Sequence, residues 1–457
     1  LGGPADAFTI AIDGTVLAFA FGIAIVTGLL FGSVPAFALT HKRATVALKE
    51  GGRGQGAGPA ALAVRNALVV AQMAAAVSLL GVAGLLIRSF VHVQQQNPGF
   101  SSEGVLSATI DLPTQRYADA TSRAQFYERL LGEARALPGV VSAGLVNNLP
   151  FSGVDGSGNY LIEGIDPKSG TFPHAYSQMV DEDFFRTMRI PLIEGRTFSP
   201  ADTAGTQGVA IVDALLVAKY FKDKDPIGQR ISTDYNTGDM SKTKWLTIVG
   251  VVGTVKRERL SEDTTKETVY AYYKQSPEAY ATLALRTNVP PTTLVAPLRA
   301  ALQRIDPEQP VFDIRTMTER IAISLDDRRT PMLLLMLFAG VALTLSAVGI
   351  YGVLAFAVAL RTGEIGVRLS LGAQRRDITR LVLGDGGRLT AIGLALGLAG
   401  AVAIGVAMRS QLYGVGAFDP LTLAVVVVVI AATAWLACWL PARRAARVQP
   451  TEALRYE

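Results

Sequence analysis

Residues 419–455 read DPLTLAVVVVVIAATAWLACWLPARRAARVQPTEALR, an apolar run of membrane length that ends in a basic tail. Residues 13–49 follow the same pattern in one register, without a gap. In both copies an Asp precedes the run, a Pro ends it, and the tail closes on Thr-x-Ala-Leu. Two segments that were similar only in hydrophobic composition would not share the same interval from Asp to Pro or the same tail. The match between residues 13–49 and 419–455 therefore indicates an internal duplication. We predict that residues 1–50 are the last helix and tail of a preceding membrane unit, and that the chain is a fragment of a longer protein.

The composition of the chain is typical of a membrane protein. Of its 457 residues, 50% are hydrophobic and 18% are charged, and the mean hydropathy is +0.33. A spanning helix needs about 20 mainly apolar residues, and a charge at its centre costs about 2.5–3.5 kcal/mol. The uncharged runs of this length are residues 15–39, 66–87, 332–360, 389–408 and 421–440. A buried helix of a soluble protein is the alternative for any one run, but five together favour a bundle of five transmembrane helices.

Positively charged residues concentrate in three segments that face one side if each run crosses the membrane once. They are His41, Lys42, Arg43, Lys49, Arg53 and Arg65; Arg361, Arg368, Arg375, Arg376 and Arg380; and Arg443, Arg444, Arg447 and Arg455. The positive-inside rule makes that side the cytoplasm. The net charge of +5 and the pI of about 9.2 therefore do not require nucleic acid as a partner. Arg88 is the exception at the outer end of the second run, where a long side chain can snorkel to the interface.

Two segments connect the first helices to the rest of the chain. Residues 51–64 are rich in glycine and are predicted to be a flexible cytoplasmic linker. A phosphate-binding loop is the alternative, but this segment follows a membrane helix and lacks the Gly-Lys-Ser/Thr ending. In residues 65–97 good helix formers continue to Asn97-Pro98-Gly99. We therefore predict a transmembrane helix that extends outward as a stalk, with ordinary juxtamembrane turns as the alternative.

Residues 98–328 form the largest polar region and are predicted to fold as an α+β domain of two subdomains outside the cytoplasm. Residues 105–112 and 140–146 have the pattern of strands, and residues 122–136 between them have the pattern of an amphipathic helix. Strand, helix and strand recur at residues 282–286, 293–305 and 311–315. Two such units can share one sheet. The intervening residues, about 150–275, are interpreted as an inserted subdomain.

The sequence contains no motif that indicates catalysis. Gly-x-Ser-x-Gly, His-Glu-x-x-His and the Walker A pattern are absent. The acidic clusters at residues 181–183, 306–308 and 326–327 are interpreted as solvated surfaces. The membrane runs have no Asp, Glu, Lys or His near their centres, which disfavours an ion-coupled transporter. The single cysteine, Cys438, and three scattered histidines predict neither a disulfide nor a metal site.

The most informative segment is RTGEIGVRLSLGAQRRDITRLVL, residues 361–383. Ile378, Leu381 and Val382 form a short apolar stripe, while Arg375, Arg376 and their polar neighbours point elsewhere. This pattern indicates an amphipathic cytoplasmic helix. Such a helix could rest on lipid headgroups, and its stripe could equally insert into a groove on a partner.

At this point the chain resembles a known family. The segment from Glu364 to Ala373, the closing PARRAARVQPTEAL, and Arg65-Asn-Ala-Leu ahead of Leu85-Leu-Ile-Arg-Ser-Phe are similar to ABC transporter permeases of the MacB and FtsX type. The resemblance covers residues 65–457 as one complete permease unit. It implies a MacB-like periplasmic core domain at 98–328 and an FtsX-like permease domain at 329–457, with a cytoplasmic coupling loop at 361–385. The tandem arrangement is similar to the duplicated permeases of acidobacteria and their relatives.

The resemblance implies a machine without a continuous substrate pore, in the bacterial inner membrane. A separate ABC ATPase would bind the cytoplasmic loop, and its closure would move the stalk and the periplasmic domain, which is called mechanotransmission. No cofactor is expected in this chain, because ATP and Mg²⁺ would be held by the ATPase, and the chain itself is not expected to be an enzyme. By matching positions, the coupling surface would consist of Glu364, Arg368, Gly372, Ala373, Arg375, Asp377 and Ile378.

Two functions remain open under this resemblance. The first is export or expulsion of a peptide, a drug or a lipoprotein. The second is an FtsX-like regulatory role, in which the outer domain controls a periplasmic partner such as a cell-wall hydrolase. A membrane-anchored enzyme is a third interpretation, but the sequence lacks a catalytic constellation. Further expected partners are membrane lipid, a second permease unit in tandem or as a dimer, and a periplasmic adaptor or outer-membrane protein.

Overall fold

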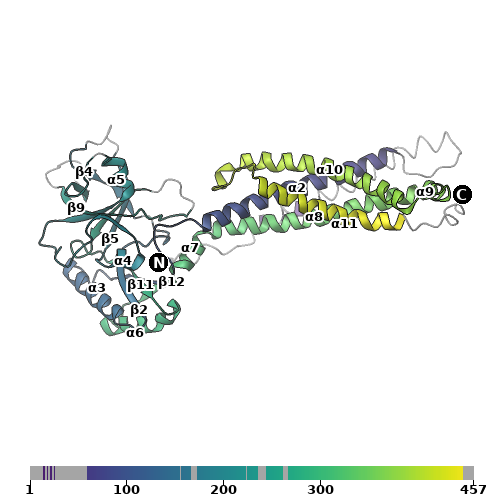
Figure 1. The fold of residues 1–457 in the computed structure, drawn as a ribbon. Coiled ribbons are helices and arrows are strands. Elements are labelled where there is room, and N and C mark those ends of the chain that lie inside the picture. The colour runs from purple at the N-terminus through teal and green to yellow at the C-terminus, as the bar shows by residue number, and fades with distance from the viewer. Residues whose placement is uncertain are drawn as a thin grey trace. The chain divides into compact units, whose positions relative to one another are not determined.

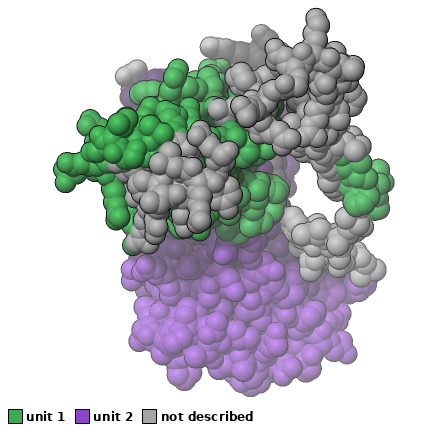
Figure 2. Space-filling model, turned by 90° about the vertical axis from the view of Figure 1, so that its right-hand side faces the viewer, with its two compact units in different colours: residues 1–89, 332–457 green, residues 90–331 purple. Residues whose placement is uncertain are grey.

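A computed structural model describes residues 59–154, 156–165, 172–222, 224–234, 243–260 and 266–445, with a few positions between 14 and 25. The chain forms two compact units, residues 1–89 with 332–457 and residues 90–331, which Figure 2 colours separately. The predicted helix at 15–39 and its Gly28-x-x-x-Gly32 pattern lie almost entirely outside the described residues, as do the linker at 51–58 and the closing tail at 446–457.

The first unit is built from long apolar helices (Figure 1). They are α2 (Pro59–Gln94), α8 (Asp326–Leu360), α10 (Arg375–Ala407) and α11 (Pro420–Ala445), joined by the short α9 (Thr362–Ser370) and η5 (Arg409–Gln411). Among the described residues these four long helices are long and apolar enough to cross a membrane. The predicted run at 389–408 is only the apolar part of α10, which begins at Arg375 because the charged residues before the run continue the same helix.

Glycines of α10 allow α2 and α10 to approach closely. A Cβ atom placed on Gly393 would lie 2.5 Å from Met73 Cγ, and one on Gly397 would lie 2.4 Å from Val77 Cβ. The Ser78 hydroxyl donates a hydrogen bond of 3.0 Å to the Gly397 carbonyl oxygen across the same contact. Small residues are the usual means of bringing helix backbones together in membranes. Gly393 and Gly397, four residues apart, thus bring the two helix backbones together.

The outer end of α2 is tied to α11. The Arg88 guanidinium forms an ion pair with Asp419, whose carboxylate also accepts the Thr422 N–H at 2.9 Å and so caps α11. Next to it the Tyr413 N–H donates to Ser89 Oγ at 2.8 Å. Arg88 was expected only to snorkel to the interface; it also has a specific acidic partner, because the start of α11 brings Asp419 within reach.

The second unit contains one sheet of 12 strands with short helices on its faces (Figure 1). The strands are β1 (Val105–Asp111), β2 (Val140–Val146), β3 (Ser157–Asn159), β4 (Leu161–Ile162), β5 (His174–Val180), β6 (Leu192–Gly195), β7 (Val209–Asp213), β8 (Arg230–Asp234), β9 (Lys244–Val252), β10 (Thr268–Tyr272), β11 (Tyr280–Thr287) and β12 (Val311–Thr316). The helices are α3 (Ala120–Arg135), α4 (Phe184–Met188), α5 (Ala214–Tyr220), η4 (Pro291–Leu294), α6 (Val295–Ile305) and α7 (Met317–Ser324).

One half of the sheet has the order β12-β1-β11-β2 and carries α3 and α6. The units β1-α3-β2 and β11-α6-β12 interleave in an antiparallel arrangement, which is the ferredoxin-like split βαβ pattern. Helix α3 begins where Asp119 accepts the Ser122 N–H at 2.9 Å, and it buries Phe126 and Leu130 against the sheet. The prediction that two strand–helix–strand units share one sheet is confirmed.

The other half continues the same sheet in the order β5-β10-β7-β9-β8-β4, with an apolar cluster of its own. It joins the first half where Val146 pairs with Val180, and two backbone hydrogen bonds flank this pair, from the Asp181 N–H to the Leu145 carbonyl oxygen at 3.1 Å and from the Asn147 N–H to the Met179 carbonyl oxygen at 3.0 Å. We call this junction the seam. Side chains extend it, because the Leu145 N–H donates to Asp181 Oδ1 at 2.8 Å and the Met179 N–H donates to Asn147 Oδ1 at 3.0 Å. The inserted residues 150–275 therefore belong to a continuous sheet within one compact unit, and two separate subdomains are not confirmed.

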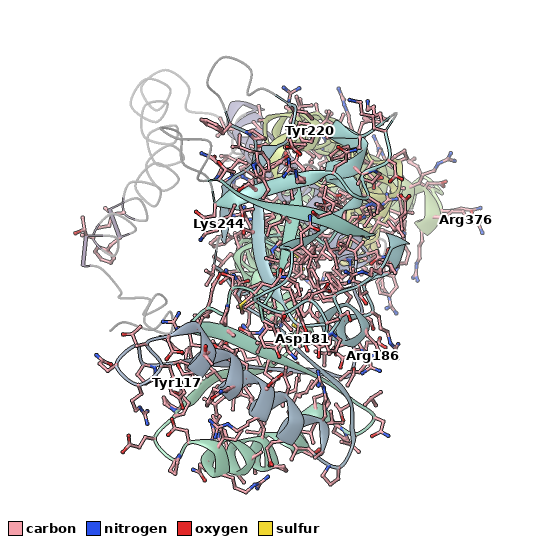
Figure 3. The ribbon with its side chains drawn as sticks, turned by 90° about the vertical axis from the view of Figure 1, so that its left-hand side faces the viewer. Tyr117, Asp181, Arg186, Tyr220, Lys244 and Arg376 are labelled. Atoms are coloured by element: carbon pink, nitrogen blue, oxygen red, sulfur yellow. The ribbon has the colours of Figure 1, made fainter. Side chains whose placement is uncertain are left out.

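Two of the predicted solvated acidic clusters are partly buried. Asp181 is 0% exposed, and its carboxylate lies 3.1 Å from the Arg135 guanidinium (Figure 3). Burial raises the pKa of Asp181 to about 8. Asp306 is also buried and accepts a hydrogen bond of 2.8 Å from the Tyr117 hydroxyl. The expectation of solvated surfaces was wrong for these two residues, because each carboxylate takes hydrogen-bond donors from a neighbouring strand or loop.

Two buried arginines fix the first and last segments of the second unit. The Arg286 guanidinium on β11 donates to the carbonyl oxygens of Thr187 at 2.6 Å, Ser101 at 2.8 Å and Glu103 at 2.9 Å. Arg320 on α7 donates to Ser107 Oγ on β1 and pairs with Asp313, both at 2.7 Å. The segment before β1 and the helix after β12 are therefore held by polar contacts in a dry environment, where such contacts are strongest.

Candidate functional site

The arginine hairpin, residues 361–385, consists of α9, a turn at 371–374 and the first turns of α10 (Figure 1). Helix α9 ends because Gly372 adopts φ +98°, in the left-handed region that favours glycine. The Ala373 N–H then donates to the Arg368 carbonyl oxygen at 3.0 Å and closes the helix end. Of the predicted coupling residues, Gly372 thus shapes the turn.

Asp377 determines where α10 begins. Its carboxylate accepts the Gln374 N–H at 2.9 Å, and the Asp377 N–H in turn donates to the Gln374 carbonyl oxygen at 2.9 Å. A carboxylate in the first turn of a helix satisfies free N–H groups and is favoured by the helix dipole. The sequence predicted Asp377 as part of a contact surface, and the structure gives it a capping role as well.

Two of the three residues of the apolar stripe face the bundle, whereas Leu381 is 38% exposed. Ile378 is 2% exposed and Val382 is 6% exposed, and both belong to the cluster that includes Leu354 of α8 and Cys438 of α11. Ile365 of α9 lies in the same cluster. The stripe was expected to be able to insert into a partner, but Ile378 and Val382 are already covered. They instead fasten the hairpin to the helices.

The outer face of the arginine hairpin is charged. Glu364 and Arg368 form an ion pair of 2.6 Å along α9, with both side chains about half exposed. Arg375 and Arg376 are exposed at the start of α10, and Arg376 projects outward from it (Figure 3). Arg361, at the end of α8, lies 3.2 Å from Asp385 of α10 and joins the two arms. Arg368, Arg375 and Arg376 therefore flank the turn, and Arg361 lies at the base of the hairpin.

Two apolar residues at the tip were not singled out from the sequence. Leu371, directly before Gly372, is 82% exposed, and Val367 on α9 is 44% exposed. Exposed apolar residues that form a patch with a polar rim are typical of protein contacts, and Leu371 and Val367 have charged residues of α9 and α10 beside them in the sequence. The sequence did offer one signal for Leu371, its position directly before the turn glycine Gly372. At a turn the helical pattern ends, so a leucine there is not assigned to a buried helix face.

The chemistry that this site offers is binding. The arginine hairpin presents guanidinium groups, three acidic side chains and an apolar tip, with no nucleophile and base placed together among its described residues. Across the described part of the chain, no group of three or more His, Cys, Asp or Glu residues is arranged to hold a metal ion.

Four membrane-length helices, a polar sheet domain inserted between the first and second of them, and a charged hairpin after the second define a membrane permease with a large outer domain. Residues 66–305 match the MacB-like periplasmic core domain family, and residues 336–450 match the FtsX-like permease C-terminal family. The chain therefore belongs to the ABC transporter permeases that combine these two domains.

Several known proteins are similar to this chain. It is 28% identical over 289 residues to the pyoverdine export ATP-binding/permease protein PvdT of Pseudomonas syringae pv. tomato, covering 61% of this chain and 42% of the relative. It is 25% identical over 290 residues to the macrolide export ATP-binding/permease protein MacB 2 of Aeromonas hydrophila subsp. hydrophila, covering 61% and 43%. The periplasmic region of MacB from Actinobacillus actinomycetemcomitans matches with 14% identity and a TM-score of 0.33, covering 50% of this chain and 95% of that one. The chain spans less than half the length of these curated relatives.

Proposed function

We propose that this chain is the permease part of an ABC-type efflux or mechanotransmission system in the bacterial inner membrane. In this proposal the arginine hairpin lies in the cytoplasm and receives an ABC ATPase, and the second unit is the periplasmic domain that moves. The observation that carries the proposal is Leu371, which is 82% exposed at the tip of a hairpin whose inner face packs against the bundle through Ile365 and Ile378.

The packing of the arginine hairpin suits the transmission of force. Ile365, Ile378 and Val382 share one core with α8 and α11, and the ion pair between Arg361 and Asp385 links the ends of α8 and α10. A push on the tip would therefore displace whole helices instead of bending a loose loop. The rim charges would set the orientation of the partner, since charged groups at the edge of a contact mainly contribute specificity and association rate.

ATP and Mg²⁺ would be bound by the ATPase. The relatives named above are ATP-binding/permease proteins, so their names place both functions in one protein. We propose a separate ATPase subunit for this chain. An ATPase on the same polypeptide is the other arrangement, and it would use the same contact on the arginine hairpin.

The movement of the periplasmic domain would export or expel a peptide, a drug or a lipoprotein. The relatives support this class, since their names describe export of pyoverdine and of macrolides. An FtsX-like regulatory role, in which the domain controls a periplasmic partner such as a cell-wall hydrolase, uses the same coupling. A second permease unit, in tandem or as a dimer, would complete the transporter, and a periplasmic adaptor or outer-membrane protein would continue the path.

The test is reconstitution of the chain with its cognate ATPase in lipid nanodiscs. We expect Leu371→Ser and the double change Arg375→Glu with Arg376→Glu to abolish ATPase binding and the stimulation of ATP hydrolysis. Arg409→Glu, an equally exposed arginine at the opposite end of α10, is the matched control and should leave both unchanged. Retention of binding in both hairpin variants would contradict the proposal.

A second measurement separates the two roles. Substrate-dependent stimulation of ATP hydrolysis in the reconstituted system would favour transport. A hydrolase that co-purifies with the chain, and is activated only when ATP is hydrolysed, would favour regulation.

A further inference from the structure

A groove of about 350 Å³ opens between α2 and α8 in the first unit. Its walls are mainly apolar, with Leu68 on α2 and Val348 on α8, and its depth comes from Gly349 and Gly352. A Cβ atom on Gly349 would lie 2.8 Å from Gln72 Oε1, whereas one on Gly352 would meet no atom within 4 Å. We call this feature the α2–α8 groove. It is an apolar slot whose α8 wall carries Val348 and Val353 with the two glycines between them, and it is open to the surroundings of the bundle.

One positive charge stands at the end of the α2–α8 groove. Arg65 is exposed, and its guanidinium carbon lies 4.2 Å from the centre of the Phe356 ring, a cation–π contact that holds the group at this end. Arg65 has no acidic partner within 4 Å among the residues that the structure describes. A cation held in place by an aromatic ring therefore stands at the mouth of an apolar slot.

We propose that the α2–α8 groove binds an anionic phospholipid of the cytoplasmic leaflet, with the phosphate on Arg65 and an acyl chain along the two glycines. The choice of leaflet rests on the proposed function, which places the Arg65 end of α2 in the cytoplasm. A guanidinium recognises phosphate oxygens in pairs. Basic pockets between transmembrane helices on the cytoplasmic side are known places for anionic headgroups. The phosphate of the lipid would thus contact the charged mouth of the groove, and its acyl chain would fill the apolar slot.

A second copy of the chain is the competing occupant, and the charges argue against it. Helix α2 contains no Asp or Glu, and α8 contains none beyond the two at its start, Asp326 and Asp327. A copy packed on this face with the same helices would bring no acidic group to Arg65. Its guanidinium would then be desolvated without compensation, which is costly. An anionic headgroup supplies the missing charge.

The helices that form the groove are the two that lead from the bundle toward residues 90–331 in the sequence. In the most apolar stretch of α8, 17% of the residues are buried in the structure, compared with 39% in that of α2. Helix α8 therefore has fewer packing contacts with the rest of the bundle than α2. A lipid in the α2–α8 groove would fill the space between them and stabilise their present separation. Anionic lipid should therefore raise the thermal stability of the whole chain.

The experiment measures lipid binding to the full chain in detergent by native mass spectrometry, with phosphatidylglycerol and phosphatidylcholine as probes and no ATPase or nucleotide present. We expect phosphatidylglycerol to bind more tightly and to raise the unfolding temperature. Arg65→Gln should weaken phosphatidylglycerol binding about fivefold, the loss expected for one interfacial charge. Gly352→Leu, which fills the slot in open space and keeps Arg65, should block both lipids. Arg409→Gln should behave as the unchanged chain.

Four outcomes would overturn the proposal. Three concern lipid binding: equal binding of the two lipids, phosphatidylglycerol binding that survives both Arg65→Gln and Gly352→Leu, and replacement of the lipid by inorganic phosphate at equal concentration. Disulfide cross-linking of Leu68→Cys between two copies in nanodiscs would show that a second copy occupies the groove, and would also overturn it. Because no ATPase is present, a failure here leaves the coupling role of the arginine hairpin untouched, and a failure of coupling leaves this result untouched.

Discussion

The two compact units of this protein are held together by different chemistry. In the first unit, glycines of α10 let backbones touch, as where Gly397 meets Val77. In the second unit, charged groups are buried and satisfied by main-chain atoms, as where Arg286 binds three carbonyl oxygens. Apolar surroundings offer little to drive helices together except close packing, whereas a sheet domain can enclose a charge once its partners are fixed. The first unit should therefore be most sensitive to added volume, and the second to lost polar contacts.

The largest effect is expected from Gly397→Leu in the first unit. A side chain at this position would collide with Val77 and the Ala74 carbonyl oxygen, so α2 and α10 must separate. We expect a loss of more than about 3 kcal/mol, the upper end for overpacking, seen as a lower unfolding temperature in detergent. Gly387→Leu on the same helix meets no atom within 4 Å and is the matched control. Equal loss in both variants would show that close backbone packing does not hold this unit together.

The next effect is expected from Arg286→Met in the second unit. Methionine retains much of the side-chain volume but leaves three carbonyl oxygens without their donor, so we expect a loss of about 2 kcal/mol. Arg304→Met removes an exposed ion pair of 2.6 Å with Glu133 and should cost less than about 1 kcal/mol. The fluorescence of Trp245, with Trp435 and Trp439 replaced by Phe, reports unfolding of this unit. Similar costs for the two arginines would contradict the comparison.

A third prediction concerns pH. Burial raises the pKa of Asp181 to about 8 from the ordinary value of 3.8, so the folded state holds this proton more tightly than the unfolded state. The stabilisation linked to this proton is complete below about pH 4 and is lost as the pH rises to about 8. Asp181→Asn should therefore make the stability of the second unit less dependent on pH in this range. The midpoint of urea unfolding, followed by Trp245 fluorescence at several pH values, measures this dependence.

Asp306 is the contrasting residue for this pH experiment. Burial alone would raise its pKa, but hydrogen bonds from Tyr117, the Glu308 N–H and Arg116 outweigh burial and lower it. Its contribution to stability is present above the ordinary pKa and is lost as the pH falls. Asp306→Asn should therefore change the acid side of the profile. A profile that Asp181→Asn leaves unaltered would refute the role of that buried carboxyl.

The smallest effect on stability is expected from Gly372→Ala in the arginine hairpin. A left-handed residue with a Cβ atom costs about 1 kcal/mol, and this cost falls on the end of α9. Hydrogen exchange of the α9 amides should accelerate while the rest of the bundle stays unchanged. Gly384→Ala, a helical glycine of α10 in open space, should instead stabilise slightly. Unchanged exchange in α9 would show that the turn does not depend on this glycine.

Periodicity predicted the elements of this fold better than their ends and contacts. Long uncharged runs identified four helices, and the alternation of apolar and polar residues identified the strands β1 and β2. An amphipathic pattern identified the helix between these strands. The sequence predicted an amphipathic helix at Arg375 and a separate apolar run at 389–408, but not that the two form the single helix α10. At Asp181 the sequence shows only three adjacent acids, and its burial depends on Leu145, which is far away in the chain. An amphipathic pattern likewise indicated that Ile378 is covered, but not that its own bundle covers it.

The seam between Val146 and Val180 has a mechanical consequence. Each half of the sheet is joined internally by longer ladders of residue pairs, whereas the sheet crosses from one half to the other at one residue pair, two flanking backbone hydrogen bonds and two side chains, with α4 packed beside them. Tension applied across the sheet would concentrate at this short junction, so the strands should separate there first. The seam is therefore the expected site of first mechanical failure of the sheet.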